Sequence, residues 1–145
     1  MTDCAPPPEP SISDCTVFKD GRGEVRHCNE FDMSPVRRFY TIRNSPGAPV
    51  RGWIVHKRET KWFLPLSGVT RIHAAPCPDP ASAPPDVSRA RVFALDAAAP
   101  RILRLPPGNA LAVEQDGSAE TMVFSDVALA GCAGDVWRFD FGGLQ

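Results

Sequence analysis

The stretch VRGWIVHK at residues 50–57, followed after a short connection by KWFLPL at residues 61–66, decides the fold. β-Branched and aromatic residues dominate both runs, and this composition favours strands over helices. The polar residues 58–60 between the runs predict a tight connection, so the two strands are expected to be neighbours. Side chains alternate faces along a strand, which puts residues 54 and 56 on one face. Pro65 cannot donate a ladder hydrogen bond and predicts an edge or a bulge there.

The rest of the chain continues the same pattern. Sixteen prolines, eleven glycines and 43% hydrophobic residues in 145 positions fit a turn-rich all-β domain. A turn at residues 20–23 predicts an opening hairpin, and residues 128–132 are the only stretch that suggests a helical turn. Further short strands are expected at residues 24–31, 36–42, 69–74, 91–95, 102–105, 111–113 and 121–124, before an alternating aromatic tail at 135–141. About ten short strands with no internal repeat predict an all-β jelly-roll barrel with little helix.

Two proline-rich segments mark the organisation of the chain. Residues 1–15 predict a disordered arm, and residues 16–145 predict a single domain that carries a long surface loop at 75–87. The N-terminus has neither the basic region nor the apolar region of a signal peptide, and no run approaches the length of a membrane span. The formal net charge of -1 does not favour nucleic acid or an anionic membrane as a partner.

The five cysteines are Cys4, Cys15, Cys28, Cys77 and Cys132, an odd number without a C-x-x-C spacing. We therefore expect buried or incidental thiols in a reducing compartment, with neither a disulfide framework nor a zinc site. The expected location is the cytoplasm.

Basic residues are concentrated around the opening strand. Seven of the sixteen lie within residues 37–61, where Glu59 is the only acidic residue. One reading is a solvated basic face, and the other is a pocket for an anionic, phosphorylated ligand.

Seven short motifs occur in a familiar order between about Val17 and about Phe141. They are Asp20-x-Arg22-Gly23, Asn29-Glu30-Phe31, Arg38-Phe39-Tyr40, Arg51-Gly52-Trp53-x-x-His56-Lys57, Ser67-Gly68, Pro106-Pro107-Gly108 and Arg138-Phe139. Together they resemble a group of cupins that contains the dTDP-4-dehydrorhamnose 3,5-epimerases and the dTDP-4-keto-6-deoxyhexose 3,4-ketoisomerases. The resemblance implies a cupin jelly-roll homodimer that binds a thymidine-diphospho sugar, with no metal and no cofactor.

In that group a base removes a proton from the carbon beside a ketone, and nearby donors hold the resulting enolate. Such chemistry suits a histidine base and a fixed cation or donor near the enolate oxygen. The resemblance puts the family's first histidine at Ile54 and its second at His56. His56 is therefore either the surviving acid or base or an interior histidine that belongs to the scaffold.

The resemblance implies roles for further residues. Arg51 matches an arginine that contacts the ligand phosphate or the sugar, and Lys61 matches the lysine that stabilises the enolate. Tyr40, the only tyrosine, supplies a hydroxyl or packs in the core. The expected substrate-binding residues are Arg51, Lys57, Arg38 and Asn109.

Three positions depart from the family by being apolar, namely Ile54, Leu111 and Phe124. Two functions therefore stay open. The chain is an epimerase or ketoisomerase that acts by metal-free proton transfer, or it is an inactive relative that binds a sugar nucleotide or glycan or pairs with another protein. A metal-dependent cupin is disfavoured, because the three histidines, His27, His56 and His73, form no His-x-His pair.

Overall fold

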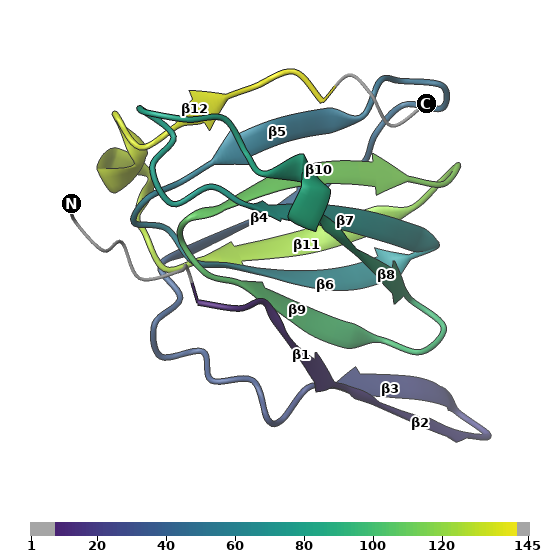
Figure 1. Ribbon diagram of the computed structural model, residues 1–145. Helices are drawn as coiled ribbons and strands as arrows, with labels where there is room; N and C mark the ends of the chain where they lie inside the picture. The colour runs from purple at the N-terminus through teal and green to yellow at the C-terminus, as the bar shows by residue number, and fades with distance from the viewer. Residues whose placement is uncertain (1–7, 142–145) are drawn as a thin grey trace.

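The computed structural model describes residues 8–141. Two five-stranded antiparallel sheets face each other as a sandwich, with strand orders β1-β9-β6-β11-β4 and β12-β5-β10-β7-β8 (Figure 1). The elements are β1 (Ser11–Asp14), β2 (Thr16–Asp20), β3 (Gly23–His27), β4 (Arg38–Ile42), β5 (Arg51–Val55), β6 (Lys61–Ser67), β7 (Val69–Pro76), η1 (Val87–Arg89), β8 (Arg91–Asp96), β9 (Arg101–Leu105), β10 (Asn109–Gln115), β11 (Glu120–Ser125), η2 (Leu129–Cys132) and β12 (Trp137–Arg138). The predicted all-β jelly roll with little helix is confirmed.

The core lies between the two sheets. It forms because every second side chain of each strand points to the inner face of its sheet. Phe63 and Val123 of the first sheet meet Ile72, Leu111 and Val113 of the second in one buried cluster. Burial of each such side chain stabilises the fold by about 1.5–3 kcal/mol. The hydrophobic strands found in the sequence therefore supply the inner faces of both sheets.

The outer face of the first sheet is covered by the segment that precedes β4. Phe31 packs on Trp62 and Phe124, with ring centroids 5.8 and 5.2 Å apart. This cover explains how Trp62 and Phe124 are buried on the face that points away from the core.

The outer face of the second sheet is covered by the C-terminal segment. Trp53 and Phe139 exchange backbone hydrogen bonds of 2.7 and 2.9 Å, and the ring of Phe141 packs against that of Trp53 with centroids 5.2 Å apart. The predicted aromatic tail thus continues past β12 as a strip along β5.

Two expectations about the N-terminal region are wrong. Ser11–Asp14 forms β1 and pairs with β9, so the disordered arm expected through residue 15 does not extend over these residues; residues 1–7 of it lie outside the described part. Cys15 and Cys28 form a disulfide that joins the two ends of the β2–β3 hairpin. The expectation of only free thiols fails because residues 15 and 28 become neighbours through hairpin pairing. The cysteine argument for a reducing compartment fails with it.

The β2–β3 hairpin pairs with neither sheet and projects from the end of the sandwich (Figure 1). Its cross-strand partners Phe18 and Val25 are 55% and 60% exposed. Pro65 lies in a central strand beside a register shift in β11, so of the two predicted alternatives the bulge is correct.

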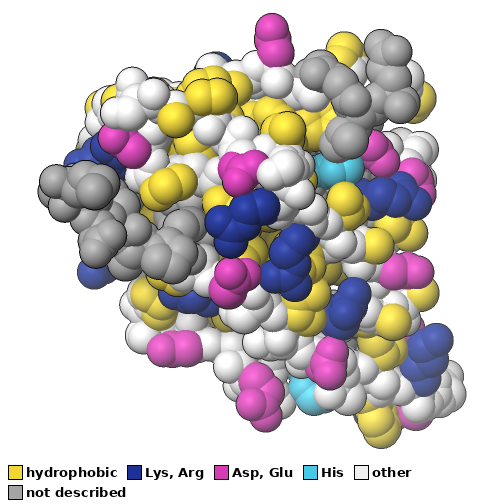
Figure 2. Space-filling model, viewed as in Figure 1, with side chains coloured by type: hydrophobic (Ala, Val, Ile, Leu, Met, Phe, Trp, Pro, Cys, Tyr) yellow, Lys and Arg dark blue, Asp and Glu magenta, His cyan; other side chains and the backbone are white. Residues whose placement is uncertain are grey.

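The surface view shows basic and acidic side chains interspersed on the face that carries β8 (Figure 2). Mixed charge of this kind gives that face no single strong field. None of the helices in residues 8–141 has the length and apolar character needed to span a membrane.

Candidate functional site

A pocket of about 410 Å³ opens between the sandwich edges formed by β4 and by β5 with β12. Its inner wall is apolar and is built by side chains of the core cluster, among them Ile54, Phe63 and Leu111. Four of its lining residues are basic, and none is acidic; the basic residues are Arg43, Arg51, Lys61 and Arg138. The pocket therefore combines an apolar interior with a net positive charge.

Lys61 lies at the start of β6 and is 7% exposed. Within residues 8–141 its ammonium group has neither an ion pair nor a hydrogen bond, and it lies 5.8 Å from the centroid of the Tyr40 ring. The Arg38 guanidinium lies 5.0 Å from the same centroid. Tyr40 is thus held near two cations at the pocket wall. Lys61 is buried there, and no acidic side chain among the described residues forms an ion pair with it.

The three arginines of the pocket are held differently. Arg51 donates from Nε to Oδ1 of Asn44, and Arg43 forms an ion pair with Glu120 at 2.7 Å. Arg138 has no ion pair among the described residues. Arg51 and Arg138 therefore keep donor groups that a ligand can use.

Ile54 and Leu111 are direct partners across the β5–β10 ladder, and both line the pocket. Residue 54 thus faces the pocket, whereas His56, which was expected on the same face, follows the end of β5 and does not line the pocket. The position that the family resemblance matches to a histidine is therefore an apolar wall of this pocket.

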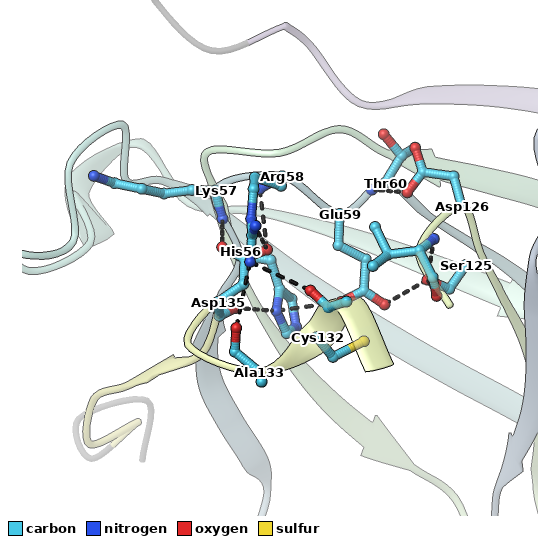
Figure 3. A network of polar contacts seen from close by, with 12 residues as sticks. His56, Lys57, Arg58, Glu59, Thr60, Ser125, Asp126, Cys132, Ala133 and Asp135 are labelled. Atoms are coloured by element: carbon cyan, nitrogen blue, oxygen red, sulfur yellow. Dashed lines mark hydrogen bonds and ion pairs between the residues drawn. The ribbon is translucent and has the colours of Figure 1, made fainter. Parts of the chain in front are cut away.

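His56 follows the end of β5 and is almost completely buried. Its Nδ1 lies 2.7 Å from the backbone oxygen of Asp135 and 3.4 Å from Oε2 of Glu59 (Figure 3). A carbonyl oxygen only accepts, so Nδ1 carries the proton and Nε2 carries the lone pair. Nε2 is buried and has no hydrogen-bond partner in residues 8–141.

The pKa of His56 lies below its ordinary value of 6.5. Burial of the ring is the main cause, and the positive charge of Lys61 is the second, against smaller opposing contributions from Asp135 and Glu59. His56 is therefore a neutral imidazole at pH 7, as a proton acceptor must be.

A buried carboxylate organises this region. Glu59 Oε1 accepts a hydrogen bond from Nη2 of Arg38 at 2.9 Å. It accepts a second from Oγ of Ser125 at 2.6 Å (Figure 3). The two cross-strand pairs that bring Arg38, Ser125 and Lys61 together lie at the end of the β4–β11–β6 ladder. The guanidinium group of Arg38 is thus paired with a carboxylate inside the protein and is not free to pair with a ligand.

Asp135 holds the turn that carries His56. Its carboxylate accepts from the backbone N–H groups of Lys57 and Arg58 at 2.8 and 3.1 Å. Sequence reasoning missed Glu59, Ser125 and Asp135. Only Glu59 had a signal, as the sole acidic residue in the basic stretch.

The structure brings together Tyr40, Arg51 and Lys61 of the predicted site residues, with His56 and Arg38 packed behind them. Two others lie elsewhere. Lys57 faces Asp79 at 3.4 Å and the Trp137 ring at 5.6 Å. Asn109 donates to the backbone oxygens of Pro106 and Pro8 at 3.1 and 3.2 Å.

Phe124 does not replace a pocket residue. It lies on the outer face of the first sheet, whereas its neighbour Val123 points into the core. Consecutive residues of a strand point to opposite faces, so Phe124 does not reach the pocket. The apolar positions that line the pocket are therefore Ile54 and Leu111, without Phe124.

In residues 8–141, no three histidine, cysteine or carboxylate side chains are arranged to hold a metal ion. No protein-family model matches the sequence, and no curated protein is similar to it in sequence.

Solved structures are similar in fold at low identity. QdtA, a 3,4-ketoisomerase from Thermoanaerobacterium thermosaccharolyticum solved as a variant with TDP-4-keto-6-deoxyglucose, has a TM-score of 0.68 and is 16% identical, covering 90% of this chain and 87% of that one. ChmJ, a 3'-monoepimerase from Streptomyces bikiniensis solved with dTDP-quinovose, has a TM-score of 0.67 and is 16% identical, covering 84% and 67%. A dTDP-sugar isomerase from Desulfovibrio desulfuricans has a TM-score of 0.69 and is 17% identical, covering 92% and 85%. The chain therefore has the jelly-roll cupin fold that these dTDP-sugar ketoisomerases and epimerases share.

Proposed function

We propose that the pocket between β4 and β5 binds a thymidine-diphospho keto sugar and that the protein is a metal-free epimerase or ketoisomerase. The observation that carries the proposal is the lining of the pocket, where four basic residues stand without an acidic one. A diphosphate has several negative charges, and arginine pairs with phosphate oxygens through two parallel hydrogen bonds. The neighbours in fold were solved with TDP or with dTDP sugars, which supports the same ligand class.

Arg51 and Arg138 are the proposed diphosphate ligands, because both line the pocket and project from its β5 and β12 wall. The sugar would then lie further in, where Ile54 and Leu111 form an apolar wall. Lys61 and Tyr40 offer an ammonium group and a hydroxyl to its ketone. In this arrangement the diphosphate contacts the arginines at the mouth of the pocket, and the ketone lies beside Lys61 and Tyr40 in its interior.

His56 is the proposed base. Its pKa is low enough to leave it neutral, and Asp135 and Glu59 hold the tautomer in which Nε2 is free to accept a proton. Because Nε2 is buried and has no hydrogen-bond partner in residues 8–141, proton transfer requires that the entering sugar displace side chains around the ring.

The alternative is a relative that binds the nucleotide sugar without turnover. The specific observation in its favour is the Ile54–Leu111 pair, which gives the pocket an apolar surface where the resemblance implies a polar one. Both functions require ligand binding, and they differ in whether carbon-bound protons exchange with solvent.

A thermal-shift panel of dTDP, dTDP-glucose, UDP-glucose and free glucose tests binding. Ligand at about 100 times its dissociation constant should stabilise the protein by about 2.7 kcal/mol. Arg51→Ala should weaken the response to dTDP, while Arg22→Ala, an exposed change on the hairpin, should leave it unchanged. No rise in melting temperature of the wild-type protein with any of these compounds would contradict both functions.

Solvent exchange separates the two functions. Wild-type protein incubated with TDP-4-keto-6-deoxyglucose in D₂O should incorporate deuterium beside the ketone, and His56→Gln should abolish it. Binding with no incorporation would support the inactive alternative. The homodimer and the cytoplasmic location stay predictions; sedimentation equilibrium should give twice the chain mass of 15.7 kDa if the dimer forms.

A further inference from the structure

A series of hydrogen bonds leads from the space between the sheets to Arg51 at the pocket. Gln115, the last residue of β10, accepts at Oε1 from the backbone N–H of Asn44 at 2.7 Å. Asn44 lies in the connection between β4 and β5, and its Oδ1 accepts from Nε of Arg51. Arg51 lines the pocket, whereas Gln115 and Asn44 do not. The orientation of a pocket side chain thus depends on two amides that lie outside the pocket.

Both sheets hold the Gln115 end of this series. Nε2 of Gln115 donates to the backbone oxygen of Ile42 on β4 at 3.0 Å. The same nitrogen lies 3.2 and 3.4 Å from the hydroxyl oxygens of Thr70 and Thr121, which are completely buried. These partners lie on β4, β7 and β11, so the glutamine joins the first sheet to the second. A backbone carbonyl on one side and a backbone N–H on the other decide which way the amide points.

Asn44 holds Arg51 without neutralising it. Asn44 is buried, and its Nδ2 donates to the backbone oxygen of Val113, the cross-strand partner of Arg51, at 3.5 Å. The uncharged amide oxygen therefore faces Arg51. Arg43 of the same pocket is instead paired with the carboxylate of Glu120. Because only Nε is bound, and to a neutral acceptor, Arg51 keeps its full charge and both terminal nitrogens for a bidentate contact with phosphate.

We propose that Gln115 and Asn44 position Arg51 for the diphosphate. The inference rests on the proposed function, in which Arg51 is a diphosphate ligand. Arg51 is exposed at the pocket, and a long side chain loses rotamer freedom when it binds a ligand. A side chain that is already held in its bound orientation loses less. Gln115 and Asn44 therefore raise the affinity for the diphosphate without contacting it, which makes both of them positioning residues.

Gln115→Met tests the first link of the series. Methionine is unbranched like glutamine and removes both amide atoms, so the backbone N–H of Asn44 loses its acceptor. The dissociation constant for dTDP, measured by calorimetric titration, should rise on the order of fivefold, since ordering one flexible side chain corresponds to a factor of roughly two to ten. Asn44→Ala removes the acceptor of Arg51 itself and should give a similar loss. A thermal melt checks folding, and Asn44→Ala carries the test if Gln115→Met is unfolded.

An Arg51→Ala background separates positioning from a general loss of stability. If Gln115 acts through Arg51, Gln115→Met weakens dTDP binding by the wild type and leaves binding by Arg51→Ala unchanged. Phe93→Leu is the stability control, because Phe93 is a core residue on β8, the edge of the second sheet that is furthest from β5. Phe93→Leu should lower the melting temperature and bind dTDP as the wild type does.

A dissociation constant of Gln115→Met within about twofold of the wild-type value would overturn the positioning role and leave the proposed function intact. An equal loss of affinity in the wild-type and Arg51→Ala backgrounds, or in Phe93→Leu, would overturn it as well. A wild type that does not bind dTDP would overturn the proposed function and this inference together.

Discussion

Removal of the Cys15–Cys28 disulfide should destabilise the protein by about 3 kcal/mol. The two cysteines are separated by 13 positions in the sequence. For a closed loop of that size, the loss of chain entropy in the unfolded state corresponds to about 3 kcal/mol at 25 °C. For a domain near this length, that loss lowers the melting temperature by roughly 6–12 °C.

The measurement is urea unfolding of the oxidised wild type and of the Cys15→Ser/Cys28→Ser double variant, followed by tryptophan fluorescence. Trp62 lies in the cluster against which both cysteines pack, so its emission reports on this region. A reductant should lower the stability of the wild type to that of the double variant and leave the double variant unchanged. A difference below about 0.5 kcal/mol would refute the reasoning, since the unfolded chain would then gain no freedom from the lost cross-link.

Three further predictions concern the pocket and its surroundings. Gly52→Ala should cost at least about 2 kcal/mol by thermal unfolding, because φ is +146° and the added Cβ would collide with Ala112; a cost near zero would show that β5 can move away from β10. The pKa of His56 is lowered in the folded state, so its contribution to the free energy of unfolding is complete above pH 6.5 and is lost as pH falls through the folded pKa. The stability difference between wild type and His56→Gln should accordingly shrink between pH 8 and pH 5 in urea unfolding, and a difference that does not vary with pH would contradict the assigned shift. Ile54→His should add no deuterium exchange to that of the wild type, because Leu111 keeps the facing wall apolar; a clear gain would show that residue 54 alone limits the chemistry.

The strands and the fold class could be predicted because they depend on local composition and on alternation. The runs at residues 50–57 and 61–66 became β5 and β6 with ends shifted by at most two residues. The disulfide and β1 could not be predicted, because each depends on a partner brought close by the fold. Cys28 reaches Cys15 through the hairpin, and Ser11–Asp14 forms a strand only because β9 offers a free edge.

For the candidate site, the sequence predicted which side chains face the pocket where alternation along a strand decides their direction. Ile54 and Lys61 both face the pocket between the sheets. The expectation that their strands are neighbours is wrong, because β5 and β6 belong to different sheets and the connection between them crosses from one sheet to the other. The partners of His56 were not predictable, since Asp135 is 79 positions away in the sequence. Phe124 was counted among the apolar site positions, but it lies outside the pocket. Its face depends on how β11 pairs with β4 and β6, which the sequence motif does not show.

Calorimetric titration of dTDP into the wild-type protein and into an Arg51→Ala/Arg138→Ala double variant tests the central claim most directly. The account predicts saturable binding of one nucleotide per pocket by the wild type. It also predicts at least about tenfold weaker binding by the double variant, since each charge-assisted hydrogen bond contributes about 1.5–3 kcal/mol. Equal affinity of the two proteins, or no heat of binding with the wild type, would contradict the assignment of this pocket to a diphosphate ligand.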